Sequence, residues 1–179
     1  MVGRLTHGAF GYRDVLVLEK EDMMFTLTSQ MQASTRIDSY ITNAMGGRST
    51  KNGKDHKMSI SALECWIQRA SGAEEFTYQQ NWVVAFKTQA ITLHYCSDLE
   101  LLLVGCDSGE IVPIQVNLKQ PEEYTQLKEY KAHSARVMGI WMDSEKKTIF
   151  SIGEDKKLVA FDFKLKKLVT GKCPKNLLH

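Results

Sequence analysis

The chain has 179 residues, a formal net charge of +2 and four cysteines, Cys65, Cys96, Cys106 and Cys173. This length suffices for a sizeable core, and the near-neutral net charge argues neither for nor against an anionic partner. The cysteines form no C-x-x-C pair, which argues against zinc-ribbon and disulfide frameworks and indicates free thiols in a reducing compartment. No apolar run approaches the ~20 residues that cross a bilayer, so we expect a cytoplasmic protein, soluble or peripherally recruited to membranes.

The first apolar runs predict a hairpin that is followed by a long insertion. Residues 14–18 and 23–29 are apolar runs joined by the charged turn 19–22. Residues 30–59 are polar and net basic, and they show no period of 2 or 3.6. Such a segment buries too little apolar surface to offset its ordering entropy, so we expect a long mobile surface insertion.

Order returns at residues 60–67, a strand that carries Trp66, so the insertion separates the second and third strands of one unit. Further strands are expected at 90–95, 101–105 and 110–116, and outer-strand candidates lie at 75–78 and 124–130. Pro113 cannot donate a ladder hydrogen bond, which predicts an edge or loosely paired strand at 110–116.

Residues 131–163 form the most regular unit of the chain. Ala132-His133 is followed by an apolar strand, a polar turn, a second strand ending in Gly153-Glu154-Asp155 and a third strand ending in Phe161. Trp66, Ile114 and Phe161 occupy equivalent third-strand positions, about 47 residues apart. This near-constant period indicates a repeat.

This order resembles the WD40 repeat, in which Gly-His stands near the start and Trp-Asp at the end. Ala132 and Phe161 replace the Gly and the Trp. The resemblance implies an all-β fold, a partial WD40 β-propeller of about three blades. The predicted repeats are 1–73 with the insertion 30–59, 74–118 and 122–163, with 164–179 as the start of a fourth repeat and a tail. Propellers close with roughly four to eight blades, so we expect a fragment or truncated form rather than an oligomer that closes the ring between chains.

Residues 104–109, 131–137 and 151–156 resemble the first blades of the WD-repeat and FYVE-domain-containing endosomal adaptors. Residues 16–22 and 63–67 fit the first blade of that family, and the resemblance fails over the insertion. The FYVE module, which in that family binds phosphatidylinositol 3-phosphate, needs eight zinc ligands in paired-Cys spacing and a basic Arg-rich motif, and these 179 residues contain neither. The resemblance therefore implies an endosomal adaptor role for a longer protein, with indirect membrane association at the early endosome through the missing FYVE region.

His133, Ser151 and Asp155 have the residue types of a catalytic triad. The resemblance instead implies a structural hydrogen-bond network at these positions. No Gly-x-Ser-x-Gly elbow surrounds Ser151, and Phe161 lacks the indole donor of the usual Trp. We therefore expect no enzyme activity. Val104 and Ser108 stand where Ser151 and Asp155 stand, so the first two repeats are predicted to lack the network and to be held mainly by apolar packing.

His94, Cys96 and Cys106 are weighed as a zinc site against simple packing, and packing is favoured because free Cys behaves as a small hydrophobe. No metal and no cofactor are expected. Trp141 is predicted to pack in the core. Trp82 follows the polar residues 79–81, so an exposed loop aromatic, a residue type enriched at binding hot spots, is weighed for it against packing in the core.

Loops 81–89, 107–109, 131–135 and 154–157 are expected to lie on one face and to contact a protein partner. The candidate residues of this surface are Trp82, Asp107, Lys131, Arg136 and Lys156. A non-catalytic interaction scaffold is thus the leading hypothesis. The alternative is peripheral binding to anionic membrane or RNA through the basic insertion (Arg48, Lys51, Lys54 and Lys57) and the Lys-rich C-terminal third. A nucleic-acid partner is less favoured because no aromatic interleaving accompanies these charges.

Overall fold

The computed structural model describes residues 10–30, 60–70 and 76–172. The predicted insertion therefore lies, apart from Gln30, outside the described residues, together with its four basic candidates. The strands on either side of it pair with each other, from Met23↔Ile67 to Gln30↔Ile60. Within the described ranges, no helix has the length and apolar character needed to span a membrane.

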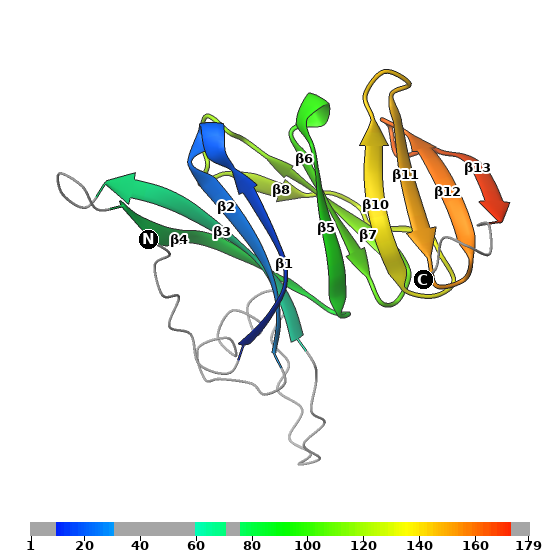
Figure 1. Cartoon of the computed structure of the whole chain (residues 1–179), viewed down its shortest axis with the longest axis horizontal. Helices are drawn as coiled ribbons and strands as arrows, with labels where there is room; N and C mark the ends of the chain where they lie inside the picture. Colours follow the sequence, from blue (N-terminus) through cyan, green and yellow to red (C-terminus); the bar gives the residue numbers. More distant parts are fainter. Residues whose placement is uncertain (1–9, 31–59, 71–75, 173–179) are drawn as a thin grey trace, which may run out of the picture.

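The described strands form three antiparallel sheets that follow one another along the chain (Figure 1). The first sheet contains β1 (Phe10–Leu18), β2 (Met23–Gln30), β3 (Ile60–Ala70) and β4 (Phe76–Phe86). The second contains β5 (Ala90–Cys96), β6 (Leu101–Cys106), β7 (Glu110–Val116), β8 (Tyr124–Gln126) and β9 (Tyr130–Lys131). The third contains β10 (Val137–Asp143), β11 (Thr148–Gly153), β12 (Lys157–Asp162) and β13 (Lys167–Lys172).

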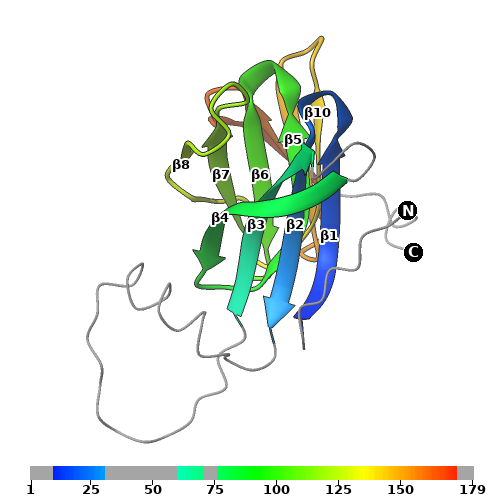
Figure 2. The ribbon, with the colours of Figure 1, turned by 90° about the vertical axis from the view of Figure 1, so that its left-hand side faces the viewer.

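The sheets are arranged as successive blades. Contacts of β5 with β1 and with β10 bring the first strands of the three sheets together, and each sheet continues outward in chain order. Viewed from the side of the first sheet, the second and third sheets lie behind it (Figure 2). The described helical residues are confined to two short 3-10 turns, η1 (Glu19–Glu21) and η2 (Ser97–Leu99). The prediction of an all-β fold with about three propeller-like blades is confirmed.

The hairpins close at turns in which a non-glycine residue adopts a left-handed conformation. Asp22 (φ 51°) ends η1 between β1 and β2, and Glu100 (φ 48°) ends η2 between β5 and β6. Beyond η1, Met23, Phe25 and Leu27 alternate with Met24, Thr26 and Thr28, which assigns the apolar set to one face of β2.

The sequence repeats and the sheets are offset by one strand. β4 falls in the predicted repeat 74–118 but pairs with β3, so it is the outer strand of the first sheet. In the same way β13 falls in the predicted segment 164–179 but pairs with β12 in the third sheet. Each repeat after the first therefore begins on the blade before it, which links neighbouring blades covalently.

Two apolar cores fill the spaces between the sheets. The core between the first and second sheets includes Phe25, Leu27, Leu63, Leu102, Val104 and Ile114. The core between the second and third sheets includes Leu103, Ile111, Val137, Ile149, Val159 and Phe161. β6 is buried on both faces and contributes to both cores, which explains its unbroken apolar sequence.

The outer strand of the second sheet differs from its prediction. A single strand was expected at 124–130, but β8 and β9 are separate and both pair with β7. Pro113 lies within β7, an interior strand, and its carbonyl accepts a hydrogen bond from Leu127 N–H at 2.9 Å. The predicted edge position of β7 is therefore wrong. Loose pairing is confirmed, because the ladder on this side is interrupted between β8 and β9, where Pro113 has no N–H to donate.

Tyr130 offers a stability test beside the second core. Its hydroxyl is buried and has no hydrogen-bond partner among the described residues, while its ring packs edge-on to Phe161 at 4.8 Å. Burial raises the pKa of this phenol. We expect Tyr130→Phe to stabilise the fold by about 1 kcal/mol in urea denaturation, because it removes an unpaired buried group and keeps the ring. Tyr124→Phe, on a more exposed tyrosine, is the control and should change little; a loss of stability in Tyr130→Phe would contradict the assignment.

Candidate functional site

Four loops meet at one end of the second and third sheets, and we call this end the loop face: residues 87–89, 107–109, 131–136 and 153–157. It forms the lower edge of the sheets in Figure 1. The first two loops are joined through the backbone: Asp107 N–H donates to Gln89 O at 2.8 Å, and Gln89 N–H donates to Asp107 Oδ1 at 3.1 Å. One candidate residue, Asp107, thus has a structural role in connecting β5 to β6.

The turn at 107–109 is connected to the loop before β10. Gly109 O accepts hydrogen bonds from Ala132 N–H at 3.1 Å and His133 N–H at 3.0 Å. The ammonium of Lys131 donates to Ser108 O and lies 4.0 Å from Glu110 Oε1. The second and third sheets therefore share one continuous surface at this end.

The last two loops are connected within the third sheet. Glu154 N–H donates to Arg136 O at 2.8 Å, and Asp155 accepts from Ser134 N–H at 3.0 Å. The predicted loops 107–109, 131–135 and 154–157 do converge on one face. Residues 81–86 do not take part, because they belong to β4 rather than to a loop.

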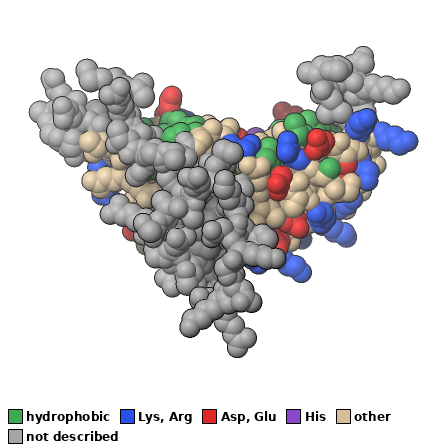
Figure 3. Space-filling view, turned by 90° about the horizontal axis from the view of Figure 1, so that it is seen from below, with side chains coloured by type: hydrophobic (Ala, Val, Ile, Leu, Met, Phe, Trp, Pro, Cys, Tyr) green, Lys and Arg blue, Asp and Glu red, His purple; other side chains and the backbone are tan. Residues whose placement is uncertain are grey.

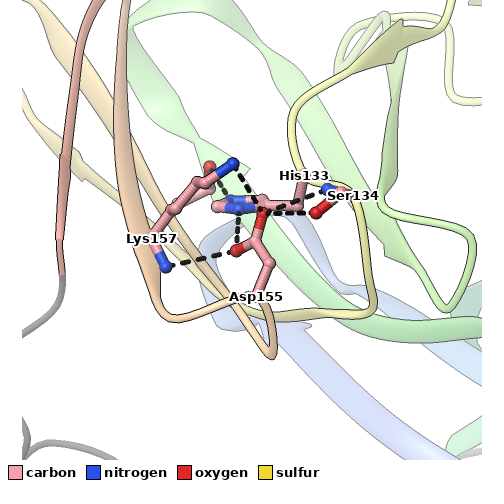
Figure 4. A network of polar contacts seen from close by, with 5 residues as sticks. His133, Ser134, Asp155 and Lys157 are labelled. Carbon is pink, nitrogen blue, oxygen red and sulfur yellow. Dashed lines mark hydrogen bonds and ion pairs between the residues drawn. The ribbon is translucent and has the colours of Figure 1, made fainter.

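The predicted His133, Ser151 and Asp155 side chains lie in hydrogen-bond contact, and Figure 4 shows His133 beside Asp155. His133 Nδ1 is 3.0 Å from Asp155 Oδ1, and His133 Nε2 is 2.9 Å from Ser151 Oγ. A carboxylate only accepts, so the Nδ1–H donates to Asp155 and Nε2 accepts the proton of Ser151. Lys157 N–H donates to the same Asp155 oxygen at 3.2 Å.

The environment of Asp155 favours its ionised form. Burial acts to raise the pKa of the carboxyl group, but hydrogen bonds from Ser134 N–H, His133 and Lys157 N–H outweigh burial and leave the pKa below its ordinary value. The network is closely packed: a Cβ placed on Gly153 would lie 2.5 Å from His133 Nδ1 and 2.8 Å from Asp155 Oδ1. A glycine at the end of β11 is therefore a steric requirement of the network.

The network lies beneath the surface. The residue exposure of Ser151 is 0% and that of His133 is 2%. The hydroxyl that a triad would use as its nucleophile thus has no exposed surface. Phe161 packs in the core between the second and third sheets and supplies no hydrogen bond.

The first sheet holds a second polar network that the sequence prediction missed. Trp66 Nε1–H donates to Thr26 Oγ1 at 2.9 Å, and Thr26 Oγ1–H donates to Glu64 Oε2 at 3.1 Å, all in a buried environment. In strand register, Thr26 relates to Trp66 as Ser151 relates to Phe161. The first sheet packs on a large apolar core, as expected, but the prediction did not include this additional polar network. In the second sheet, Val104 is buried in the apolar core, as expected.

Trp82 is not an exposed loop aromatic. It lies on β4 with 7% exposure, and its ring packs 4.5 Å from that of Tyr124. Its Nε1–H donates to Pro121 O at 2.8 Å. Trp82 therefore secures the loop before β8 to the first sheet and does not belong to the loop face.

The prediction for Trp141 is also wrong, in the opposite direction from that for Trp82. It was expected in the core, but its exposure is 40% and its ring stacks on Phe150 at 5.4 Å. Neighbouring residues Ile140 and Ile149 enter the core between the second and third sheets. Strand alternation therefore directs Trp141 and Phe150 to the face of the third sheet that points away from the second sheet.

His94, Cys96 and Cys106 are not brought together. Cys96 pairs with Leu101 and Cys106 with Ala90, at opposite ends of the β5–β6 hairpin. Burial raises the pKa of Cys96 to about 12 and of Cys106 to about 11, and burial lowers the pKa of His94. Across the described ranges, no three His, Cys, Asp or Glu side chains are grouped so as to hold a metal ion.

Comparisons with known proteins give a distant likeness only. No protein-family model matches the sequence, and none of the curated proteins matches it. Among the solved structures that match is a chain in the crystal structure of the mitotic checkpoint complex, with a TM-score of 0.45 and 15% sequence identity. The match covers 65% of this chain and 35% of that chain, so this chain spans about a third of its length.

Proposed function

We propose that the protein is a non-catalytic interaction scaffold whose loop face binds a protein partner. The observation that carries the proposal is the connection of loops from two blades, 107–109 and 131–136, into one surface by backbone hydrogen bonds. Surfaces fixed in this way bind with little loss of conformational entropy. The exposed side chains Arg136 and Lys156 extend from this surface.

The burial of Ser151 supports a scaffold over a hydrolase. The distances from His133 to Ser151 and Asp155 match those of a catalytic triad, but an attacking hydroxyl has to reach a substrate carbonyl. With no exposed surface, Ser151 instead provides a buried polar contact that fixes β11 to the loop before β10.

The resemblance of residues 104–109, 131–137 and 151–156 to endosomal adaptors supports a finer proposal. In this proposal the propeller is part of a longer adaptor in vesicle trafficking, cytoplasmic and recruited to early endosomes by a FYVE region outside these residues. Imaging of the tagged 179-residue chain tests it. We expect a diffuse cytoplasmic signal from the chain alone and a punctate signal on early endosomes when a FYVE module is fused to the C-terminus. With its loop face free, the fused chain should also recruit its protein partner to these endosomes. A fused chain that recruits no partner would contradict the adaptor role.

A photo-cross-linking experiment tests the scaffold proposal itself. A cross-linking amino acid is placed at Ser134 on the loop face and, as the control, at Glu145 in the β10–β11 turn at the opposite end of the third sheet. We expect a discrete, saturable cross-linked protein band from Ser134 and none from Glu145 when the full chain is expressed in cells. Equal or absent cross-linking from the two positions would contradict a partner at the loop face.

A further inference from the structure

We propose that the loop-face end of the third sheet binds an acidic segment of a protein partner, through a basic cluster formed by Arg136, Lys156, Lys157 and Lys172. This inference rests on the proposed function and names the chemistry of the partner. Figure 3, seen from the loop-face end, shows Lys and Arg side chains along the right-hand arm, which is the third sheet.

The backbone that carries the basic cluster is fixed by the buried network. Arg136 follows the loop that contains His133 and Ser134, and Lys156 and Lys157 follow Asp155. Hydrogen bonds join these two loops at Glu154 N–H to Arg136 O (2.8 Å), Ser134 N–H to Asp155 Oδ2 (3.0 Å) and His133 to Asp155. The cationic side chains thus start from one rigid base, which lowers the cost of ordering them on a ligand.

The acidic groups nearby do not neutralise the basic cluster. Asp155 is 6% exposed at its side chain and accepts from His133 and Ser134, so only a distant contact of 4.0 Å remains for Lys157 Nζ. Glu154 is the exposed carboxylate in this turn. Among the described residues, Arg136, Lys156 and Lys172 form no ion pair within 4.0 Å. The cluster therefore retains a net positive charge.

The strand register adds an observation that points to an anionic ligand. Lys157 lies directly opposite Lys172 in the antiparallel β12–β13 pair. Like charges directly opposite each other in a sheet are unfavourable. An anion between the two ammonium groups would convert this repulsion into two attractive contacts, so this pair gains more from an anion than two isolated surface lysines would.

The surroundings favour a peptide over a nucleic acid or a bilayer. The exposed aromatic side chains Tyr12, Tyr78, Tyr124 and Trp141 lie outside the four loops, so the described loop face offers no stacking surface for bases. Met138, 47% exposed at the start of β10, is the exposed large apolar side chain nearest Arg136 in the sequence, and Leu168 and Val169 are exposed on β13, which also carries Lys172. Three such side chains suit contacts with a peptide and are too few for insertion into a membrane.

Fluorescence anisotropy with the full 179-residue chain tests the proposal. The probes are a fluorescein-labelled Glu-rich 12-residue peptide, the same peptide with phosphoserine in place of Glu, and a Gln counterpart. Arg136→Gln/Lys156→Gln/Lys172→Gln removes three positive charges from the cluster. Lys147→Gln/Lys164→Gln/Lys166→Gln removes three from the turns at the opposite end of the third sheet and is the matched control. Circular dichroism confirms that both variants keep the fold.

We expect one or both anionic peptides to bind, the Gln peptide not to bind, and the cluster variant to weaken binding about tenfold while the control variant changes it by less than about twofold. A preference for phosphoserine over Glu would identify a phosphorylated partner, and the reverse an Asp/Glu-rich one. Equal weakening in both variants, or binding of phosphatidylserine vesicles or single-stranded RNA without binding of either peptide, would overturn the proposal. If the peptides fail while Ser134 still cross-links to a protein, the scaffold function stands and the acidic partner does not.

Discussion

Gly109→Ala is expected to destabilise the protein by about 3 kcal/mol or more, the largest effect of a single methyl group in the described structure. Gly109 has a φ of +87°, which a side chain makes unfavourable. A Cβ at this position would collide with His133 O and would lie 2.5 Å from Ala135 O. Both obstacles are backbone atoms, so the strain cannot be relieved by a rotamer change. Urea denaturation followed by circular dichroism measures the loss.

Gly171→Ala is the matched control for this variant. Gly171 lies on β13, is exposed, and a Cβ there would meet no atom within 4 Å. We expect a change within about 0.5 kcal/mol, because the alanine meets no obstacle and β13 is an edge strand. A loss of stability in Gly109→Ala as small as that in Gly171→Ala would mean that glycine at 109 is replaceable. The turn at 109 would then not hold the second and third sheets together.

Local patterning explains how much of this fold was predictable. Charged turns between alternating apolar runs predicted the β1–β2 and β5–β6 hairpins, because strand pairing across a short turn depends on neighbouring residues. The network of His133, Ser151 and Asp155 was implied by the resemblance of residues 131–163 to a WD40 repeat. Its members lie within 22 residues of each other in one regular repeat. Both predictions therefore depended on information close together in the sequence.

The two tryptophans show where local information ends. Trp82 and Trp141 both lie on strands, and alternation assigns each to one of two faces without saying which face a neighbouring sheet covers. Trp82 is buried by Tyr124 and Pro121 from the next sheet, contacts that no local pattern contains. Its polar neighbours at 79–81 are exposed or half-buried residues of β4 and made the segment resemble a loop. Trp141 is exposed because the described chain places no further sheet against it.

The missed network in the first sheet has the same cause. Thr26 and Trp66 are 40 residues apart, and the insertion between them obscured the repeat period. A sequence signal did exist: Trp66 occupies the third-strand position of the repeat, where an indole N–H requires an acceptor on the preceding strand. Alternation on 23–29 leaves the Thr26 and Thr28 hydroxyls on the face opposite the apolar residues, and Thr26 meets that requirement.

Asp155→Ala is expected to cost about 3 kcal/mol at neutral pH, because it leaves the buried His133 Nδ1–H without its acceptor and also removes the acceptor of Ser134 N–H. Glu154→Ala is the matched control: its side chain is exposed and adjacent in sequence, so its loss should cost less than about 0.5 kcal/mol. Urea denaturation at pH 7 compares the two variants. Equal losses of stability in the two variants would show that the hydrogen bonds of Asp155 contribute no more to stability than an exposed carboxylate does.

The dependence of stability on pH separates the charge of Asp155 from its volume. The pKa of Asp155 in the folded protein is held below its ordinary value of 3.8, so the unfolded chain binds this proton first as the pH falls. The stability that Asp155 contributes is therefore complete above about pH 4 and is lost as the pH falls through its lower, folded-state pKa. We expect the parent protein to lose stability below pH 4 more steeply than Asp155→Ala, so that the difference between them narrows with acidification. A constant difference from pH 7 to the lowest pH at which both chains remain folded would show that Asp155 stabilises the loop face by packing alone, without its charge.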